Sequence, residues 1–144
     1  MQNQIEKWKS QGYLGNDVPE LSTIKSTVDW QDTSKSLELR ARSYIDINCA
    51  HCHRVGGHCS YVPQRFNFSN TDMYTFGVCL TPLTSVAGSP FEINAGNADN
   101  SLMIVKMSST VGSVMMPYIG RTVVHQEGVA LMKEWINAMP STCR

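Results

Sequence analysis

Two thiols and two imidazoles lie within five residues, in the segment Cys49-Ala50-His51-Cys52-His53. Cysteines at this spacing can reach the vinyl groups on neighbouring pyrroles of one porphyrin, and the adjacent imidazole can then bind its iron. The C-x-x-C-H pattern therefore predicts one covalently attached c-type haem. In this interpretation Cys49 and Cys52 are the thioether positions and His53 is the proximal iron ligand.

Three other interpretations of this segment stay open. Thioredoxin-like redox chemistry places its C-x-x-C at a helix N-terminus, where the helix dipole lowers the thiol pKa, whereas here the pair is expected to close a helix. A buried pair of structural cysteines is the second alternative. The third is a zinc site, since enough candidate ligands lie close together in the sequence: Cys49, Cys52, His53, His58 and Cys59.

A second iron ligand is available in the distant segment Met115-Met116-Pro117. Methionine is a common sixth ligand of covalently bound haem, and a following proline stiffens the chain that carries it. Met116 is preferred because it directly precedes Pro117. Two alternatives remain: the methionines fill gaps in the core, or His58 or His125 binds the iron instead.

Helices at three places would position these residues. Leu37, Ala41, Tyr44, Ile45 and Asn48 recur at helical spacing, which predicts a helix from Ser34 or Ser36 to Asn48 that ends at the cysteine motif. A short helix is expected after residues 97–100 and a longer one from about His125 to Met139, with a further short turn near Gln4–Lys9. Residues 54–95 and 108–124 show no sustained period, and wrapping a large cofactor would explain loops of this length.

The overall composition narrows the function classes. The chain has 144 residues and 16.0 kDa, which predicts one ordinary domain. Its 12 basic and 12 acidic residues give zero net charge, which argues against a nucleic-acid binder held by phosphate neutralisation. No apolar run approaches the roughly 18 residues that span a bilayer. The N-terminal residues show no secretory signal.

The chain resembles class I c-type cytochrome domains, and more narrowly a bacterial group found at the C-terminus of larger exported proteins. The resemblance covers about residues 36–139, and its specific part is the C-x-x-C-H motif. The matching segments are residues 40–54, Ala95-Gly96-Asn97, Ser101-Leu102, Met116-Pro117, Gln126-Glu127-Gly128 and Trp135-Ile136.

This resemblance implies a mainly α fold, a small cytochrome c-like helical domain with long loops wrapped around one covalently bound haem. It implies thioether bonds at Cys49 and Cys52, axial iron ligands His53 and Met116, and Trp135 packed against the first helix near the haem. Pro63 and Pro82 are the candidates for the carbonyl that orients His53. Residues 1–35 would form an N-terminal extension packing on the core, and residues 36–144 the cytochrome c-like domain.

The implied activity is electron transfer, because two axial ligands leave no iron position for a substrate. The chain would be an electron carrier rather than an enzyme, suited to serve as the haem module of a larger oxidoreductase. Its expected partner is a redox protein or a fused dehydrogenase-like domain, with no nucleic acid and no membrane span. An open or weak sixth position at the iron would instead indicate a haem enzyme or a gas-binding domain. The zinc interpretation would indicate a zinc-stabilised binding module.

Three cysteines remain after haem attachment: Cys59, Cys79 and Cys143. Thioether attachment occurs in an oxidising compartment, so we expect a periplasmic or otherwise exported protein whose signal or preceding domain is absent from this sequence. Cys59 and Cys79 share the long loop, which predicts a Cys59–Cys79 disulfide and leaves Cys143 free or intermolecular.

Overall fold

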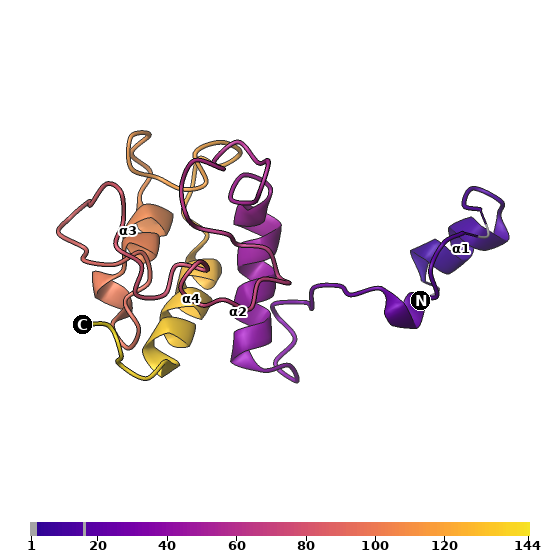
Figure 1. Cartoon of the computed structure of the whole chain (residues 1–144), viewed down its shortest axis with the longest axis horizontal. Helices are drawn as coiled ribbons and strands as arrows, with labels where there is room; N and C mark the ends of the chain where they lie inside the picture. Colours follow the sequence, from indigo (N-terminus) through magenta and orange to yellow (C-terminus); the bar gives the residue numbers. More distant parts are fainter. Residues whose placement is uncertain (1–2, 16) are drawn as a thin grey trace.

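A computed structural model describes residues 3–15 and 17–144. It contains four α-helices and, among these residues, no strand: α1 (Gln4–Ser10), α2 (Leu37–Ile45), α3 (Leu102–Ser108) and α4 (Gln126–Ala138) (Figure 1). Shorter turns are the 3₁₀ segments η1 (Leu21–Thr23) and η3 (Ala98–Asn100) and the π-helical segment η2 (Asp46–Ala50). The prediction of a mainly α domain with long irregular stretches is confirmed.

Helix α2 begins where a serine caps it and ends earlier than predicted. The Ser36 hydroxyl accepts a hydrogen bond from the Leu39 amide at 3.3 Å, so Ser36 rather than Ser34 is the N-cap. The chain then continues past Ile45 in the wider turn of η2. Within that turn the Asp46 carboxylate accepts from the Phe68 amide at 2.7 Å, which ties the end of the helix to the following loop.

The core lies where α2 packs on α4. Ile45, Met132 and Ile136 are almost completely buried between the two helices. Gly128 of α4 faces Tyr44 of α2, and a methyl group at Gly128 would lie 2.1 Å from the Tyr44 Oη atom. Only a residue without a side chain permits this approach, so the glycine sets how closely the helices pack.

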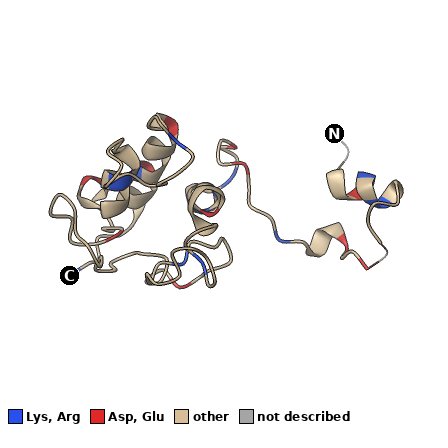
Figure 2. Cartoon of the chain, turned by 90° about the horizontal axis from the view of Figure 1, so that it is seen from above, with Lys and Arg blue, Asp and Glu red and all other residues tan. Residues whose placement is uncertain are grey.

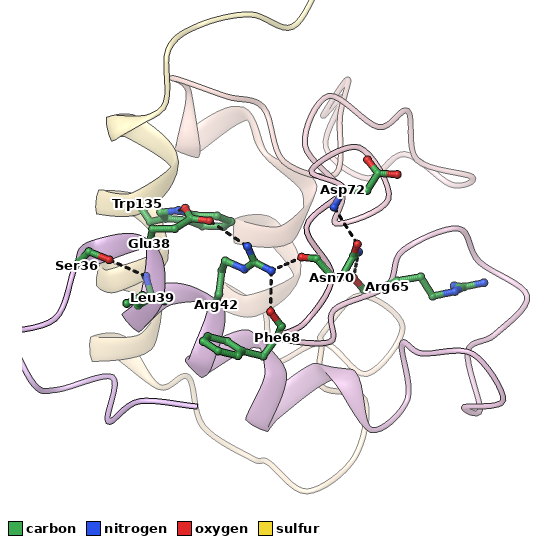
Figure 3. A network of polar contacts seen from close by, with 9 residues as sticks. All are labelled: Ser36, Glu38, Leu39, Arg42, Arg65, Phe68, Asn70, Asp72 and Trp135. Atoms are coloured by element: carbon green, nitrogen blue, oxygen red, sulfur yellow. Dashed lines mark hydrogen bonds and ion pairs between the residues drawn. The ribbon is translucent and has the colours of Figure 1, made fainter. Parts of the chain in front are cut away.

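Half-buried Arg42 joins α2 to the loop that follows the cysteine motif, and its neighbour Glu38 joins α2 to α4. The Arg42 guanidinium donates to the carbonyls of Phe68 (at 2.8 Å) and Asn70, and lies 3.5 Å from the Glu38 carboxylate (Figure 3). The indole Nε1–H of Trp135 donates to the same carboxylate. Because the guanidinium carries several donors in a fixed fork, one side chain can hold both the helix and the loop.

The N-terminal segment contacts the helical body through its last residues. The Val28 amide donates to the Ser43 hydroxyl at 2.9 Å, and the Trp30 carbonyl accepts from Arg40 Nε at 2.8 Å. Figure 1 shows α1 standing apart from α2, α3 and α4, at the end of an extended stretch. None of the residues of α1 is buried.

The disulfide prediction is wrong, because the structure joins Cys79 to Cys143 and leaves Cys59 free. After α4 the chain turns back along residues 93–96, and this return places the Cα atoms of the two bonded cysteines 5.1 Å apart. Cys59 is held elsewhere, in a turn where its amide donates to the Cys52 carbonyl at 3.0 Å. The proximity of Cys59 and Cys79 in the sequence therefore did not indicate which cysteine pairs with Cys79.

Charges are spread over the molecule in both signs. Figure 2 shows acidic and basic positions interspersed along the ribbon, in agreement with the zero net charge. In the part of the chain that the structure describes, no helix has the length and apolar character needed to cross a membrane.

Candidate functional site

A cavity of about 830 Å³ opens beside the cysteine motif. This volume falls in the range of about 300–1,000 Å³ that is typical of small-molecule and cofactor sites. One wall comes from the end of α2 and from η2, and the opposite wall from the loop that precedes α4. The lining residues that matter below are Tyr44, Ile47, Asn48, Cys49, His51, Met107, Met116, Ile119, Arg121, Val123, His125 and Val129.

Cys49 lies on the wall of this cavity as a free thiol. Burial, reinforced by the neighbouring Cys52, raises the pKa of the Cys49 thiol to about 12. Cys49 and Cys52 are not paired, although the same chain forms a disulfide between two other cysteines. Two unpaired thiols at this spacing remain available for thioether bonds.

Cys52 and His53 directly follow the lining residue His51 in the chain but are not themselves among the lining residues. The His53 ring packs on Phe66 with centroids 5.1 Å apart, and its buried Nδ1 atom has no hydrogen-bond partner. Neither Pro63 nor Pro82 therefore provides the expected carbonyl. Burial, assisted by nearby positive charges, lowers the pKa of His53 to about 4, so the ring is neutral and keeps a free lone pair.

Met116 lies on the same cavity as Cys49, far away in the sequence. Its amide donates to the Lys106 carbonyl at the end of α3, at 3.0 Å, and its peptide bond to Pro117 is cis. Met115 is half-buried and is not among the lining residues. Of the two methionines that the sequence offered, the structure brings Met116 to the site.

Tyr44 and His125 form a polar pair on the cavity wall that the sequence did not predict. Tyr44 Oη and His125 Nδ1 are 2.8 Å apart, and the two rings stack with an interplanar angle of 19°. Trp30 packs edge-on against both rings. Burial raises the pKa of Tyr44. The helical spacing had placed Tyr44 on the buried stripe, but no sequence signal connected it to His125.

The remaining predicted site residues lie away from the cavity. Trp135 is 3% exposed and packs edge-on against Phe76, in the core rather than on the cavity wall. His58 is exposed. Burial is the main cause of the raised pKa of the free Cys59 thiol, to which its neighbour Cys52 also contributes.

The zinc alternative finds no set of ligands in the structure. Among residues 3–15 and 17–144, no three His, Cys, Asp or Glu side chains are grouped closely enough to hold a metal ion. A structural zinc site normally has four such ligands in tetrahedral arrangement.

Comparison of the chain with family models, with curated proteins and with solved structures finds no match. The interpretation of the site therefore depends on its own residues.

Proposed function

We propose that this chain holds one c-type haem covalently and carries electrons through it. The observation that supports this most directly is the juxtaposition of Cys49 and Met116 on one large cavity, next to the free thiol of Cys52 and the unpaired imidazole of His53. These four side chains are the donor set that a haem with His/Met coordination requires.

The residues present fit such a group in three respects. The cavity is large enough for a cofactor, and much of its wall is apolar: Ile47, Met107, Ile119, Val123 and Val129. Ile47, Ile119 and Val123 are 57%, 68% and 72% exposed and lie together on this cavity, and exposed apolar side chains grouped in this way are typical of a ligand-binding groove. The buried Nδ1 atom of His53 has no hydrogen-bond partner in the protein. A buried polar atom without a partner is rare, and it is expected on a ring whose bonding is completed by a ligand.

Each residue has a defined task in this proposal. Cys49 and Cys52 would hold the group through thioether bonds, and His53 and Met116 would bind its iron. The bound group supplies one-electron chemistry at its iron. The apolar wall keeps water away, and together with the methionine donor it favours the reduced state. If His53 and Met116 both bind the iron, no position would be left for a substrate, and the chain would act as a carrier and not as an enzyme.

The setting of this function follows from the same chemistry. Thioether attachment and a disulfide both belong to oxidising compartments, so we place the protein in the periplasm or another exported location. Its partner would be a redox protein or a fused dehydrogenase-like domain that makes a small, weak contact. Because charges of both signs are interspersed, the electron-exchange rate should depend only modestly on ionic strength.

The direct test is the mass and absorption spectrum of the protein produced in an exported compartment with haem-attachment machinery. We expect the mass of the polypeptide plus one haem, and a ferric Met–iron charge-transfer band. That band should disappear in Met116→Ala and persist in the matched control Met115→Ala. A colourless protein with the bare polypeptide mass would refute the proposal. A haem protein without the band would indicate the gas-binding or enzymatic alternative.

A further inference from the structure

Arg121 is a half-buried arginine whose donors are directed at main-chain carbonyls rather than at a carboxylate. Its Nη1 atom donates to the Met107 carbonyl at 2.9 Å and to the Val123 carbonyl at 3.5 Å. Its Nη2 atom donates to the Lys106 carbonyl at 3.1 Å and to the Ser109 carbonyl. The guanidinium thus binds the C-terminal end of α3 and the start of the loop that follows it.

The same helix end also holds Met116. The Lys106 carbonyl accepts from the Met116 amide at 3.0 Å and from Arg121 at 3.1 Å. One carbonyl therefore connects the backbone of the candidate iron ligand to the arginine, and both residues line the cavity. Between these two attachment points, residues 117–120 contain an exposed tyrosine and an exposed isoleucine and give the loop little burial of its own.

Arg121 is not free to bind a ligand in the cavity. Both of its Nη atoms are occupied by carbonyls, and its remaining Nε–H is buried without a partner. A lysine could not reproduce the arrangement, because its ammonium is a single point and cannot span carbonyls on both sides of the helix end. The geometry favours a role that acts through the loop.

We infer that Arg121 is a positioning residue for Met116: it fastens the loop to the end of α3 so that the thioether stays directed at the cavity. This inference rests on the proposed function. It requires that the strength of the bond between Met116 and the iron depends on Arg121, although Arg121 would not itself contact the iron.

The test measures how readily external imidazole displaces Met116 from the ferric iron of the haem-loaded protein. Imidazole can bind only when the methionine has left, so its apparent dissociation constant falls as Met116 ligation weakens. Losing even one charge-assisted hydrogen bond at Arg121 is enough for about a tenfold change, equivalent to about 1.4 kcal/mol. We expect Arg121→Gln to bind imidazole at least about tenfold more tightly than the unaltered protein. The imidazole affinity of Arg121→Lys should lie between those of Arg121→Gln and the unaltered protein. Met116→Ala, which has no methionine to displace, sets the upper limit of the affinity.

Arg65→Lys is the matched control. The Arg65 guanidinium also binds main-chain carbonyls, those of Ser60, Val62 and Gln64, but none belongs to the loop that carries Met116. Lysine keeps the positive charge there, so this variant should keep both the imidazole affinity and the charge-transfer band of the unaltered protein.

The outcomes separate this inference from the function on which it rests. If the unaltered protein takes up no haem, the proposed function fails, and the inference with it. If it takes up haem and the Arg121 variants bind imidazole with unchanged affinity, only the inference is overturned. If both Arg121 variants lose haem while Arg65→Lys keeps it, Arg121 supports the fold as a whole, and the specific role is again refuted.

Discussion

Replacing Gly128 with alanine tests the contact between α2 and α4 on which one side of the site depends. A methyl group at this position would lie 2.1 Å from Tyr44 Oη, 2.3 Å from Tyr44 Cζ and 2.7 Å from His125 Nδ1. The tyrosine ring cannot simply rotate away, because Trp30 and His125 pack against it. The helices must therefore separate, or the aromatic cluster must rearrange.

The expected magnitude is the difference between two opposing effects. Alanine in place of glycine inside a helix stabilises by about 1 kcal/mol. Overpacking a core typically destabilises by about 1–3 kcal/mol, and a rigid ring at these distances belongs at the upper end of that range. We expect a net destabilisation of about 2 kcal/mol. For a chain of this size that lowers the melting temperature by about 4–8 °C.

The assay is thermal unfolding of the loaded protein followed by far-UV circular dichroism. Ala130, exposed on the same helix, provides the calibration: Ala130→Gly should cost about 1 kcal/mol, with no packing contribution. In a Tyr44→Ala background, Gly128→Ala should become less destabilising, because the two closest contacts are gone and only His125 Nδ1, at 2.7 Å, still has to move. If Gly128→Ala stabilises the otherwise unaltered protein by the full helical amount, the described packing of Tyr44 on Gly128 is refuted.

Further predictions concern the disulfide, a buried carboxyl and the core tryptophan. Replacing both Cys79 and Cys143 with serine should destabilise the protein by up to about 4 kcal/mol in chemical denaturation, because the bond closes a loop with a sequence separation of 64. Burial raises the pKa of Glu92, so its ionisation opposes folding. Glu92→Gln should therefore raise the melting temperature at neutral pH, and the gain should vanish as pH falls and the native carboxyl takes up its proton. Glu38→Ala leaves the Trp135 N–H without its acceptor and should cost about 1.5–3 kcal/mol by the same denaturation measurement.

Each of these predictions has a control or an outcome that would contradict it. Non-reducing peptide mapping should recover Cys79 linked to Cys143, and a peptide linked through Cys59 would contradict the structure. Glu134→Gln, at an exposed position of α4, should change stability by no more than about 0.5 kcal/mol at any pH. A stabilisation by Glu92→Gln that persists unchanged at low pH would show that ionisation is not its cause. If Glu38→Ala leaves the free energy of unfolding unchanged, the contact between Glu38 and Trp135 does not contribute to stability.

Helix positions followed well from the sequence where local signals sufficed. The cap at Ser36 and the apolar spacing on α4 are properties of adjacent residues, and both predicted helices are present. The end of α2 was missed, since the change to the wider η2 turn accompanies a bond between Asp46 and the Phe68 amide. A contact of this kind joins segments that are distant in the sequence, so the spacing of apolar residues does not reveal it. The disulfide failed for the same reason: only the return of the C-terminal segment brings Cys143 to Cys79.

The candidate site divides in the same way. The motif around Cys49 and the choice of Met116 came from residue type and spacing, and the structure places both on one cavity. The contacts of Tyr44 and Arg121 could not be predicted, because each depends on a partner from another element. Arginine directed at carbonyls has no sequence signature, and a tyrosine on a buried stripe does not disclose which histidine it meets.

The Cys79–Cys143 bond divides the molecule into a covalent ring and an open limb. The ring contains α3, α4 and Met116, whereas α2 and the cysteine motif lie on the limb outside it. Apart from the main chain itself, the two sides of the cavity are therefore joined by packing and hydrogen bonds and not by this disulfide. Separating the two sides would therefore require no reduction of a disulfide, and the Cys79–Cys143 bond would still close the ring that carries Met116.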